Sequence, residues 1–417
     1  MYSLQLSPEQ LEIRDTVRDF TTSEIKPVAL NERRLDAVDR RLPMDLVDQA
    51  AQMGLRTLAL SEERGGAGAD QLTSCMVTEE LAAGDADIAA VLATSSCLGH
   101  LLFDRLMTDD QRARFLPDFV RDDRFHLAFA GLEAGTDTRL GVNYHRPVAD
   151  ALKVATVAAR AANGDWVVNG VKSYVANAPI ARLFAVLVAT PERASPGVLL
   201  VPAGAPGMTV RAHERPWAHG CGGEVSFADV RVPAGNLLGE EAAALLWQAD
   251  PMGEGMPLIQ ALSLGIGRAA YEAALDYAPI RVQGGRRIIE HQAIGTKLAE
   301  IAIRLEVARA AVWRAAWTSD HPEAVADRSV PDLPLQSIAH VFTTEMMVKV
   351  AKDSAEMFGG MGVMRDMPLQ KYINDARICL HSGNGNSDAK LRLAEAIAGY
   401  RRPTEPARAP APAVAAE

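Results

Sequence analysis

The spacing of apolar residues changes twice along this chain, and these changes limit the folds that it can adopt. From Ser7 to about residue 124 the apolar positions recur at helical intervals, as Ile13, Val17 and Phe20 do. Short apolar runs typical of strands follow to about residue 240, and long helical patterns then return. This order predicts an α+β protein with an N-terminal helical domain (1–125), a middle β-barrel or sandwich domain (126–240), a C-terminal four-helix bundle (241–403) and a disordered tail (404–417).

Local signals place the individual elements. Ser7, Pro8 and Gln10 supply the N-cap, the first-turn proline and the capping-box glutamine of a helix. Gly54 is expected to stop a helix over 44–53. The remaining helices are expected at 71–84, 86–105 and 109–121, and those of the bundle at 258–277, 290–317, 334–358 and 389–400. An Asn163-Gly164-Asp165 turn predicts a hairpin between strands at 152–157 and 166–168, with further strands at 184–188, 198–201 and 225–227.

Charge and composition exclude several functional classes. The net charge of -10 is opposite to that of a nucleic-acid-binding surface. No uninterrupted apolar run reaches the roughly 18 residues of a membrane span, and the N-terminus does not resemble a secretory signal. The 4 cysteines are far apart and show no CxxC spacing. We therefore expect free thiols, no metal site and a cytoplasmic location.

Several motifs occur in a fixed order, and together they identify a family. Two lie in the C-terminal domain: Gly265-Ile266-Gly267-Arg268 followed by Arg281 and Gln292, and the glycine-rich segment 356–362. The others cover residues 128–137, 169–177, 224–240 and 375–386. Their composition and order resemble the acyl-CoA dehydrogenase family over residues 7 to 400. The resemblance implies that family's three-domain fold and an FAD-dependent oxidoreductase.

The resemblance also implies which residues contact FAD. Arg281 and Gln292 match an arginine and a glutamine that reach the FAD diphosphate and adenine region, commonly from a neighbouring subunit, which implies a homodimer or homotetramer. Glu356 stands where a glutamine is usual, and its charge weakens FAD binding unless it turns away or a cation compensates it. The remaining FAD-contacting positions are Met357, Phe358, Gly359, Gly360, Phe129, Ala130, Thr136, Tyr174, Ala176, Asn384, Gly385 and Asn386.

The usual catalytic base of the family is missing from its motif. Residues 375–386 match the segment that carries this glutamate, but the matching position is Gly383. In some relatives the base comes instead from the start of the C-terminal domain, where Glu254 is the candidate here, one residue out of register. His381 is a second candidate, and Asp388 is expected to face away.

The resemblance therefore predicts oxidation of an acyl thioester, on CoA or a carrier protein, at the α–β bond. The electron acceptor would be an electron-transfer flavoprotein or oxygen. Because Ala130, Tyr174, Ala176 and Gly383 all depart from the family near the flavin ring, two alternatives stay open. One is a monooxygenase, oxidase or decarboxylating oxidase on the same fold. The other is a non-catalytic subunit in a hetero-oligomer with an active paralogue.

Overall fold

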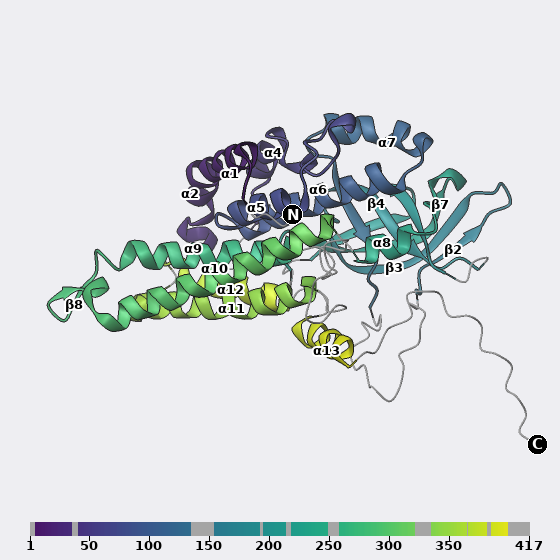
Figure 1. The fold of residues 1–417 in the computed structure, drawn as a ribbon. Coiled ribbons are helices and arrows are strands. Elements are labelled where there is room, and N and C mark those ends of the chain that lie inside the picture. The colour runs from purple at the N-terminus through teal and green to yellow at the C-terminus, as the bar shows by residue number, and fades with distance from the viewer. Residues whose placement is uncertain are drawn as a thin grey trace, which may run out of the picture.

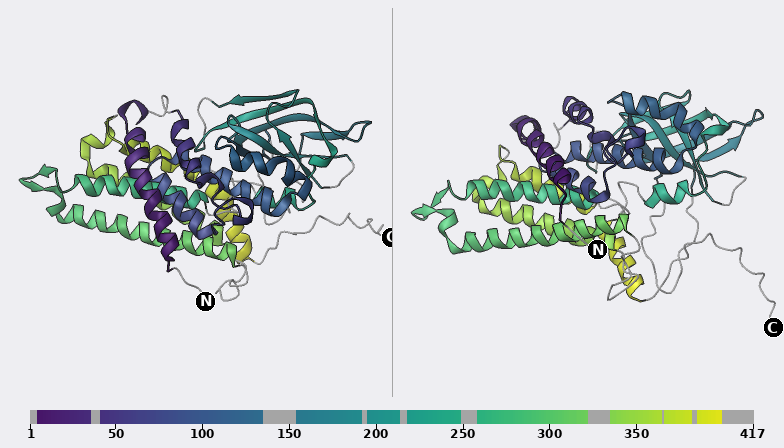
Figure 2. Two further views of the ribbon diagram at one scale, coloured as in Figure 1. Left: turned by 90° about the horizontal axis from the view of Figure 1, so that it is seen from above. Right: turned by 45° about the horizontal axis from the view of Figure 1, so that its top comes forward.

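A computed structural model describes residues 5–35, 41–134, 154–191, 195–213, 218–248, 258–321, 335–364, 366–381 and 385–398. A long helical bundle forms one side of the molecule, with the N-terminal helices packed along it (Figure 1). The β domain lies at one end of the bundle and a small β hairpin at the other, as further views also show (Figure 2). The order of helical, β and helical parts predicted from the sequence is confirmed.

The N-terminal part begins with the predicted capping box. Ser7 accepts a hydrogen bond from the Gln10 N–H, and the Gln10 side chain accepts one from the Ser7 N–H. Gly54, with a φ of 83°, follows the second predicted helix as expected. The helices are α1 Pro8–Phe20, η1 Thr21–Ile25, α2 Lys26–Ala29, α3 Glu32–Leu35, α4 Met44–Gln52, η2 Leu55–Thr57, η3 Glu62–Arg64, α5 Gln71–Ala82, α6 Ala86–Gly99, η4 His100–Leu106 and α7 Asp109–Arg121.

One continuous helical stretch, Ala86–Leu106, is long and apolar enough by length and composition to cross a membrane. Of its most apolar window, 78% is buried inside the protein. Ile88, Leu92 and Leu98 are almost completely buried in this stretch, which explains its apolar composition by packing in the core.

The middle part is a sandwich of two sheets with the strand orders β1-β4-β5 and β2-β3-β7-β6. Trp166, Phe184 and Phe227 belong to the core formed by the strands. The predicted hairpin is present, but the described residues 154–156 of its predicted first strand precede β2, which starts at Val157, and two strands, β1 and β6, were not predicted. The strands are β1 His126–Ala130, β2 Val157–Arg160, β3 Trp166–Ala176, β4 Ala181–Val188, β5 Gly197–Pro202, β6 Met208–Ala212 and β7 Gly222–Val232, followed by η5 Ala234–Asn236 and α8 Ala242–Gln248.

The C-terminal bundle differs from the prediction in its fourth helix. The fourth helix, which packs against α9 and α11 as α10 does, is α12. It buries Leu369, Tyr372, Ala376 and Cys379 on one face. The segment predicted as fourth helix instead forms α13, beside α11. The elements are α9 Leu258–Tyr277, β8 Val282–Gln283, β9 Arg286–Arg287, η6 Ile288–Glu290, α10 Gln292–Asp320, α11 Leu335–Met357, η8 Gly359–Val363, α12 Leu369–Leu380 and α13 Gly385–Ile397.

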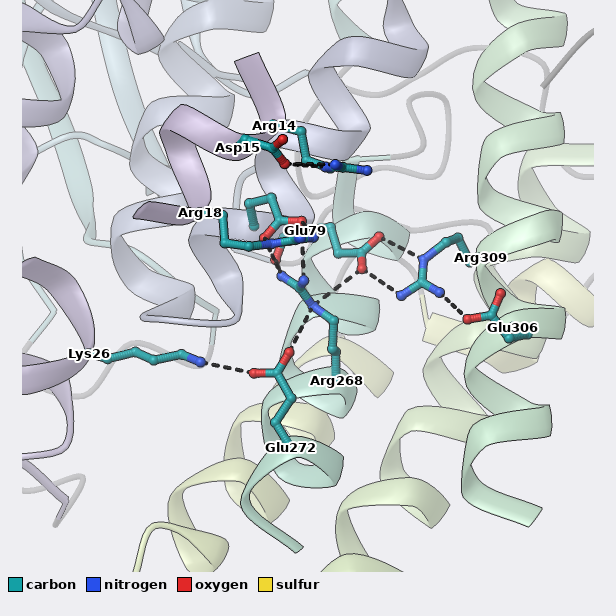
Figure 3. A network of polar contacts seen from close by, with 10 residues as sticks. Arg14, Asp15, Arg18, Lys26, Glu79, Arg268, Glu272, Glu306 and Arg309 are labelled. Atoms are coloured by element: carbon teal, nitrogen blue, oxygen red, sulfur yellow. Dashed lines mark hydrogen bonds and ion pairs between the residues drawn. The ribbon is translucent and has the colours of Figure 1, made fainter. Parts of the chain in front are cut away.

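A buried ionic network connects the N-terminal helices to the bundle (Figure 3). Glu80 on α5 lies 2.7 Å from an Arg268 nitrogen on α9 and 2.7 Å from an Arg18 nitrogen on α1. Its neighbour Glu79 pairs with Arg309 on α10 at 2.9 Å. Burial by itself raises the pKa of Glu80, but the pairs with Arg18 and Arg268 outweigh it and lower the pKa. The Glu80 carboxylate is therefore charged in the interior, where it depends on its arginine partners.

Candidate active site

An apolar pocket lies where α6, β3, α9 and α12 meet, at the end of the bundle beside the β domain. Its volume is about 40 Å³, and most of its lining surface is contributed by carbon atoms. Its lining includes Ala93, Ala176, His219, Leu258 and Cys379. Ala176 is a predicted flavin-contacting residue, and Cys379 precedes the predicted base position, Gly383, by four residues in the sequence. The fold thus joins two of the motifs at one pocket.

The end of β3 has an unusual backbone that Asn177 holds in place. Tyr174 and Asn177 have φ values of 57° and 60°, in the left-handed region that few residues adopt. The buried Asn177 side chain donates hydrogen bonds to the Val91 carbonyl and to Ser95 on α6, both at 3.2 Å. These bonds fix the distance between β3 and α6, and Ala176 lies between the two strained positions.

Three other predicted residues of the β domain lie on or next to this strand. Tyr174 is 45% exposed, and its ring centroid is 5.6 Å from that of His213. Phe129 and Ala130 on β1 are buried in two hydrophobic cores. The Ala130 side chain belongs to the core of the sandwich, so only the backbone of this residue is left to contact a flavin.

A buried ion pair that the sequence did not single out fixes the segment after β1. Lys172 on β3 is fully buried, and its Nζ donates to Glu133 at 2.6 Å and to the Gly131 carbonyl at 3.2 Å. Glu133 also accepts hydrogen bonds from the Ala155 and Thr156 N–H groups. Burial lowers the pKa of Lys172 to about 8, despite the favourable effect of Glu133. The pair joins β1, β3 and the start of β2 next to the site.

His219 is a second feature that the sequence did not single out. Its side chain is 4% exposed, and its two ring nitrogens lie 3.2 Å from an Asp87 carboxylate oxygen and 2.9 Å from the Asp375 carbonyl. Both neighbours are acceptors, so both ring nitrogens must donate, which requires the imidazolium form. Burial lowers the pKa of His219, but Cys379, Asp87 and Asp375 raise it, and the net pKa lies well above its usual value. His219 is therefore a fixed cation in the pocket wall.

This cation predicts a specific dependence of stability on pH. The pKa of His219 is raised on folding, so the stability that it contributes is complete below about pH 6.5 and is lost as the pH rises through the folded-state pKa. We expect His219→Gln to cost about 1–3 kcal/mol at pH 6, and the cost to shrink as the pH rises above 6.5. Urea unfolding of parent and variant at a series of pH values measures this. A difference that grows with pH would contradict the assignment, and Asp87→Asn should weaken the same trend.

The opposite end of the bundle carries the residues predicted to hold the ADP half of FAD. Arg281 and Gln292 are exposed at the β8–β9 hairpin and at the start of α10. Nearby, the rings of Tyr277 and Phe358 stack with centroids 4.1 Å apart. Phe358 leads into Gly359 and Gly360, where an added Cβ would have no atom within 4 Å. An open glycine backbone beside exposed donors fits the close approach of a dinucleotide diphosphate.

Glu356, which stands where a glutamine is usual, pairs with lysines that compensate its negative charge. Its carboxylate lies 2.6 Å from the Lys297 Nζ on α10 and 3.8 Å from the Lys352 Nζ on its own helix. The hydrogen bond from Lys297 lowers the pKa of Glu356. The charge is thereby neutralised locally, and the exposed backbone of Gly359 and Gly360 keeps its ability to approach an anion.

Some of the remaining predicted residues are described by the structure, and others lie outside the described ranges. Asn386 on α13 is hydrogen-bonded to Thr344 and Glu345 of α11, each at 3.2 Å, and Gly385 has a φ of 76°. His381 is exposed at the end of α12. Glu254, Thr136, Gly383, Asn384 and the Asp388 side chain lie outside the described residues, as does the tail 404–417.

Comparisons with known proteins agree with the order of the three domains. Sequence models of three acyl-CoA dehydrogenase domains match the chain: the N-terminal domain over residues 7–123, the middle domain over 148–230 and the C-terminal domain over 247–397. An acyl-CoA dehydrogenase of Bacillus subtilis is 29% identical over 401 residues, which cover 95% of this chain and 100% of that protein. Benzylmalonyl-CoA dehydrogenase of Aromatoleum aromaticum is 30% identical over 396 residues, or 94% of this chain and 98% of that protein.

A solved structure shows the same fold. Butyryl-CoA dehydrogenase from Megasphaera elsdenii matches with a TM-score of 0.81 at 24% identity, covering 95% of this chain and 100% of that chain. The domain matches and the full-length relatives account for the motifs and the order of the domains. The chain therefore belongs to the acyl-CoA dehydrogenase family and is an FAD-dependent oxidoreductase of that type.

Proposed function

We propose that this protein oxidises an acyl thioester at its α–β bond, with the acyl group in the pocket between α6, β3, α9 and α12. The observation that carries the proposal is the position of Ala176, a predicted flavin contact, in the wall of an apolar pocket. An acyl chain is apolar and fits such a lining, while the polar carrier, CoA or a carrier protein, stays outside. The protein would act in the cytoplasm, with an electron-transfer flavoprotein or oxygen as acceptor.

Two groups of this chain's residues would hold the cofactor, and they lie at opposite ends of the bundle. Tyr174, Ala176 and the backbone of Phe129 and Ala130 are at one end, and Arg281 is at the other. The 23 residues of α11 between these ends span about 35 Å, which is longer than an extended dinucleotide. Arg281 and Gln292 would therefore contact the FAD of a neighbouring subunit, in a homodimer or homotetramer. FAD supplies a two-electron acceptor when bound.

Glu254 is the proposed base that removes the α proton. It precedes Leu258, a pocket residue, by four positions, so chain length alone keeps its backbone within about 14 Å of Leu258. We expect Glu254→Gln to slow flavin reduction by acyl-CoA about 10²–10⁴-fold because a positioned general base contributes that much. The FAD content should not change.

The measurement is anaerobic loss of the oxidised flavin absorbance after mixing with a series of acyl-CoAs. His381→Gln is the matched control because His381 is exposed, and it should stay within threefold of the parent. Unchanged reduction in Glu254→Gln would refute the role of Glu254. Absence of reduction by every acyl-CoA, with FAD bound, would refute oxidation of these substrates.

One structural observation favours a second candidate reaction, which consumes oxygen. The Ala176 methyl group lies in the pocket wall at a position where the family typically offers a hydroxyl toward flavin N5. A monooxygenase, oxidase or decarboxylating oxidase would consume oxygen together with the acyl thioester. Product analysis and oxygen uptake separate these reactions from dehydrogenation, and a protein that takes up no FAD would point to a non-catalytic subunit.

A further inference from the structure

His219 brings an ionic side chain into an otherwise apolar pocket. Among the described residues that line the pocket, it is the only lysine, arginine, histidine, aspartate or glutamate. The other described lining residues are alanines, leucines, one isoleucine, one threonine and one cysteine. A charge in such surroundings is screened less than it would be in water, so it acts over a longer distance. Of the described lining, His219 therefore contributes most to the electrostatic potential of the pocket.

The hydrogen bonds of His219 restrict what its side chain can do in a reaction. Its Nδ1 lies 3.2 Å from an Asp87 carboxylate oxygen, and its Nε2 lies 2.9 Å from the Asp375 carbonyl oxygen. Both ring nitrogens are therefore donors, and both N–H groups are already used. The ring is thus held in place and neither exchanges a proton with a substrate nor donates a hydrogen bond to it. What it offers a bound molecule is its positive charge, which acts through space.

The counter-charges of His219 are set back from the pocket. Neither Asp87 nor Asp375 is among the described residues that line it. Asp87 lies in the first turn of α6, where a negative charge is favourable, and it also accepts a hydrogen bond from the Gly220 N–H at 3.0 Å. The Asp375 carboxylate lies 2.6 Å from the Lys371 Nζ. The pocket is therefore lined by the positive end of the Asp87–His219 pair.

The proposed reaction develops negative charge in this pocket. When the α C–H bond of the acyl thioester breaks, its proton goes to the base, proposed above as Glu254. The electron pair of that bond remains on the α carbon and the thioester oxygen until the β carbon gives a hydride to the bound FAD. A positive charge that is already fixed nearby stabilises such an anion without the cost of reorientation.

We propose that His219 supplies a fixed positive charge that stabilises the negative charge developing in the pocket during the reaction. This inference rests on the proposed function, because that function places the acyl thioester in the pocket. No direct contact is needed. At an effective dielectric constant of about 20, a unit charge about 10 Å away changes an ionisation equilibrium by about tenfold.

The test uses the full-length, FAD-loaded protein and 3-oxobutanoyl-CoA, whose α carbon loses a proton to give an enolate. The pH at which the bound ligand ionises is followed by ultraviolet absorbance. We expect His219→Gln to raise this pH by about one unit, which is about a tenfold smaller ionisation constant, because the variant leaves the Asp87 carboxylate without its cation. Adding Asp87→Asn should reverse about half of the shift, since it removes the unpaired carboxylate but does not restore the cation.

His100→Gln is the matched control. His100 forms the same kind of pair, with its Nδ1 2.9 Å from an Asp104 carboxylate oxygen, but it is not among the described residues that line the pocket. The ionisation constant should stay within twofold of the parent's. A shift of less than threefold in His219→Gln, with the ligand bound, would overturn the inference and leave the proposed function standing. A larger shift that is undiminished in the double variant would also overturn it, because lost packing and not lost charge would then be the cause.

Failure of the proposed function gives a different pattern. If 3-oxobutanoyl-CoA does not bind and no acyl-CoA reduces the flavin, the reduction potential of the bound FAD decides the inference separately. Reduction adds two electrons to the cofactor, and a nearby cation favours it. His219→Gln should lower the potential by about 30 mV, which is a tenfold change in the equilibrium constant for two electrons. A potential equal to those of the parent and His100→Gln would overturn the inference.

Discussion

Replacement of Arg268 by methionine is expected to destabilise the protein by about 3–5 kcal/mol. Methionine keeps most of the packing volume but removes the guanidinium that lies 2.7 Å from Glu80. Glu80 is 3% exposed, so its carboxylate would be left in the interior with Arg18 as its remaining close partner. The cost comes from this uncompensated buried charge and not from the loss of one surface contact.

The loss is measured as a lower urea midpoint at fixed protein concentration and saturating FAD, because bound ligands and subunits also contribute to stability. Arg14→Met is the control. Arg14 pairs with Asp15, but the two side chains are 28% and 58% exposed, so this variant should lose less than about 0.5 kcal/mol. Adding Glu80→Gln to Arg268→Met should recover part of the loss, and an additive further loss would contradict the buried-charge explanation.

The second large effect is expected from Gly265→Ala, with a loss of about 3 kcal/mol. A Cβ at this position of α9 would lie 2.4 Å from the Glu79 carbonyl oxygen and 2.8 Å from the Ala82 Cβ. These atoms belong to the backbone and the first side-chain atom of α5, so they cannot rotate away, and the two helices must separate. The same urea experiment measures the shift.

Gly295→Ala on α10 is the matched control because it makes the same chemical change in a helix interior. An added Cβ there has no atom within 4 Å, so the substitution should stabilise the protein by about 0.5–1 kcal/mol. The two variants should therefore shift the midpoint in opposite directions. A gain of equal size in both would show that helix propensity, and not the contact between α5 and α9, decides the effect.

The sequence was most informative where local spacing or a local signal specifies the structure. The capping box at Ser7, the turn at Gly164 and the helical period of α9 all lie within a few residues of the elements that they define. The fourth helix of the bundle was assigned to the wrong segment. The buried positions of α12 from Leu369 to Cys379 are few, and they follow a glycine-rich segment that looks like a loop.

Local sequence signals predicted only some of the residues that line the pocket. Ala176 was expected at the site from its motif, but His219 lies in a glycine-rich stretch with no periodic pattern. Its charge follows from Asp87, which is 132 residues earlier, and from the Asp375 carbonyl, which is 156 residues later.

The sequence by itself determined the family, the order of the three domains and the cofactor because these depend on motifs and periodicities that are local in the chain. Only the tertiary structure decided why Gly265 and Arg268 are needed and where the pocket lies. These properties depend on contacts between helices whose partners are far apart in sequence, as Arg268 and Glu80 are at 188 residues. Burial and pairing are set by such contacts, and the free energy of a charge or a hydroxyl depends on them.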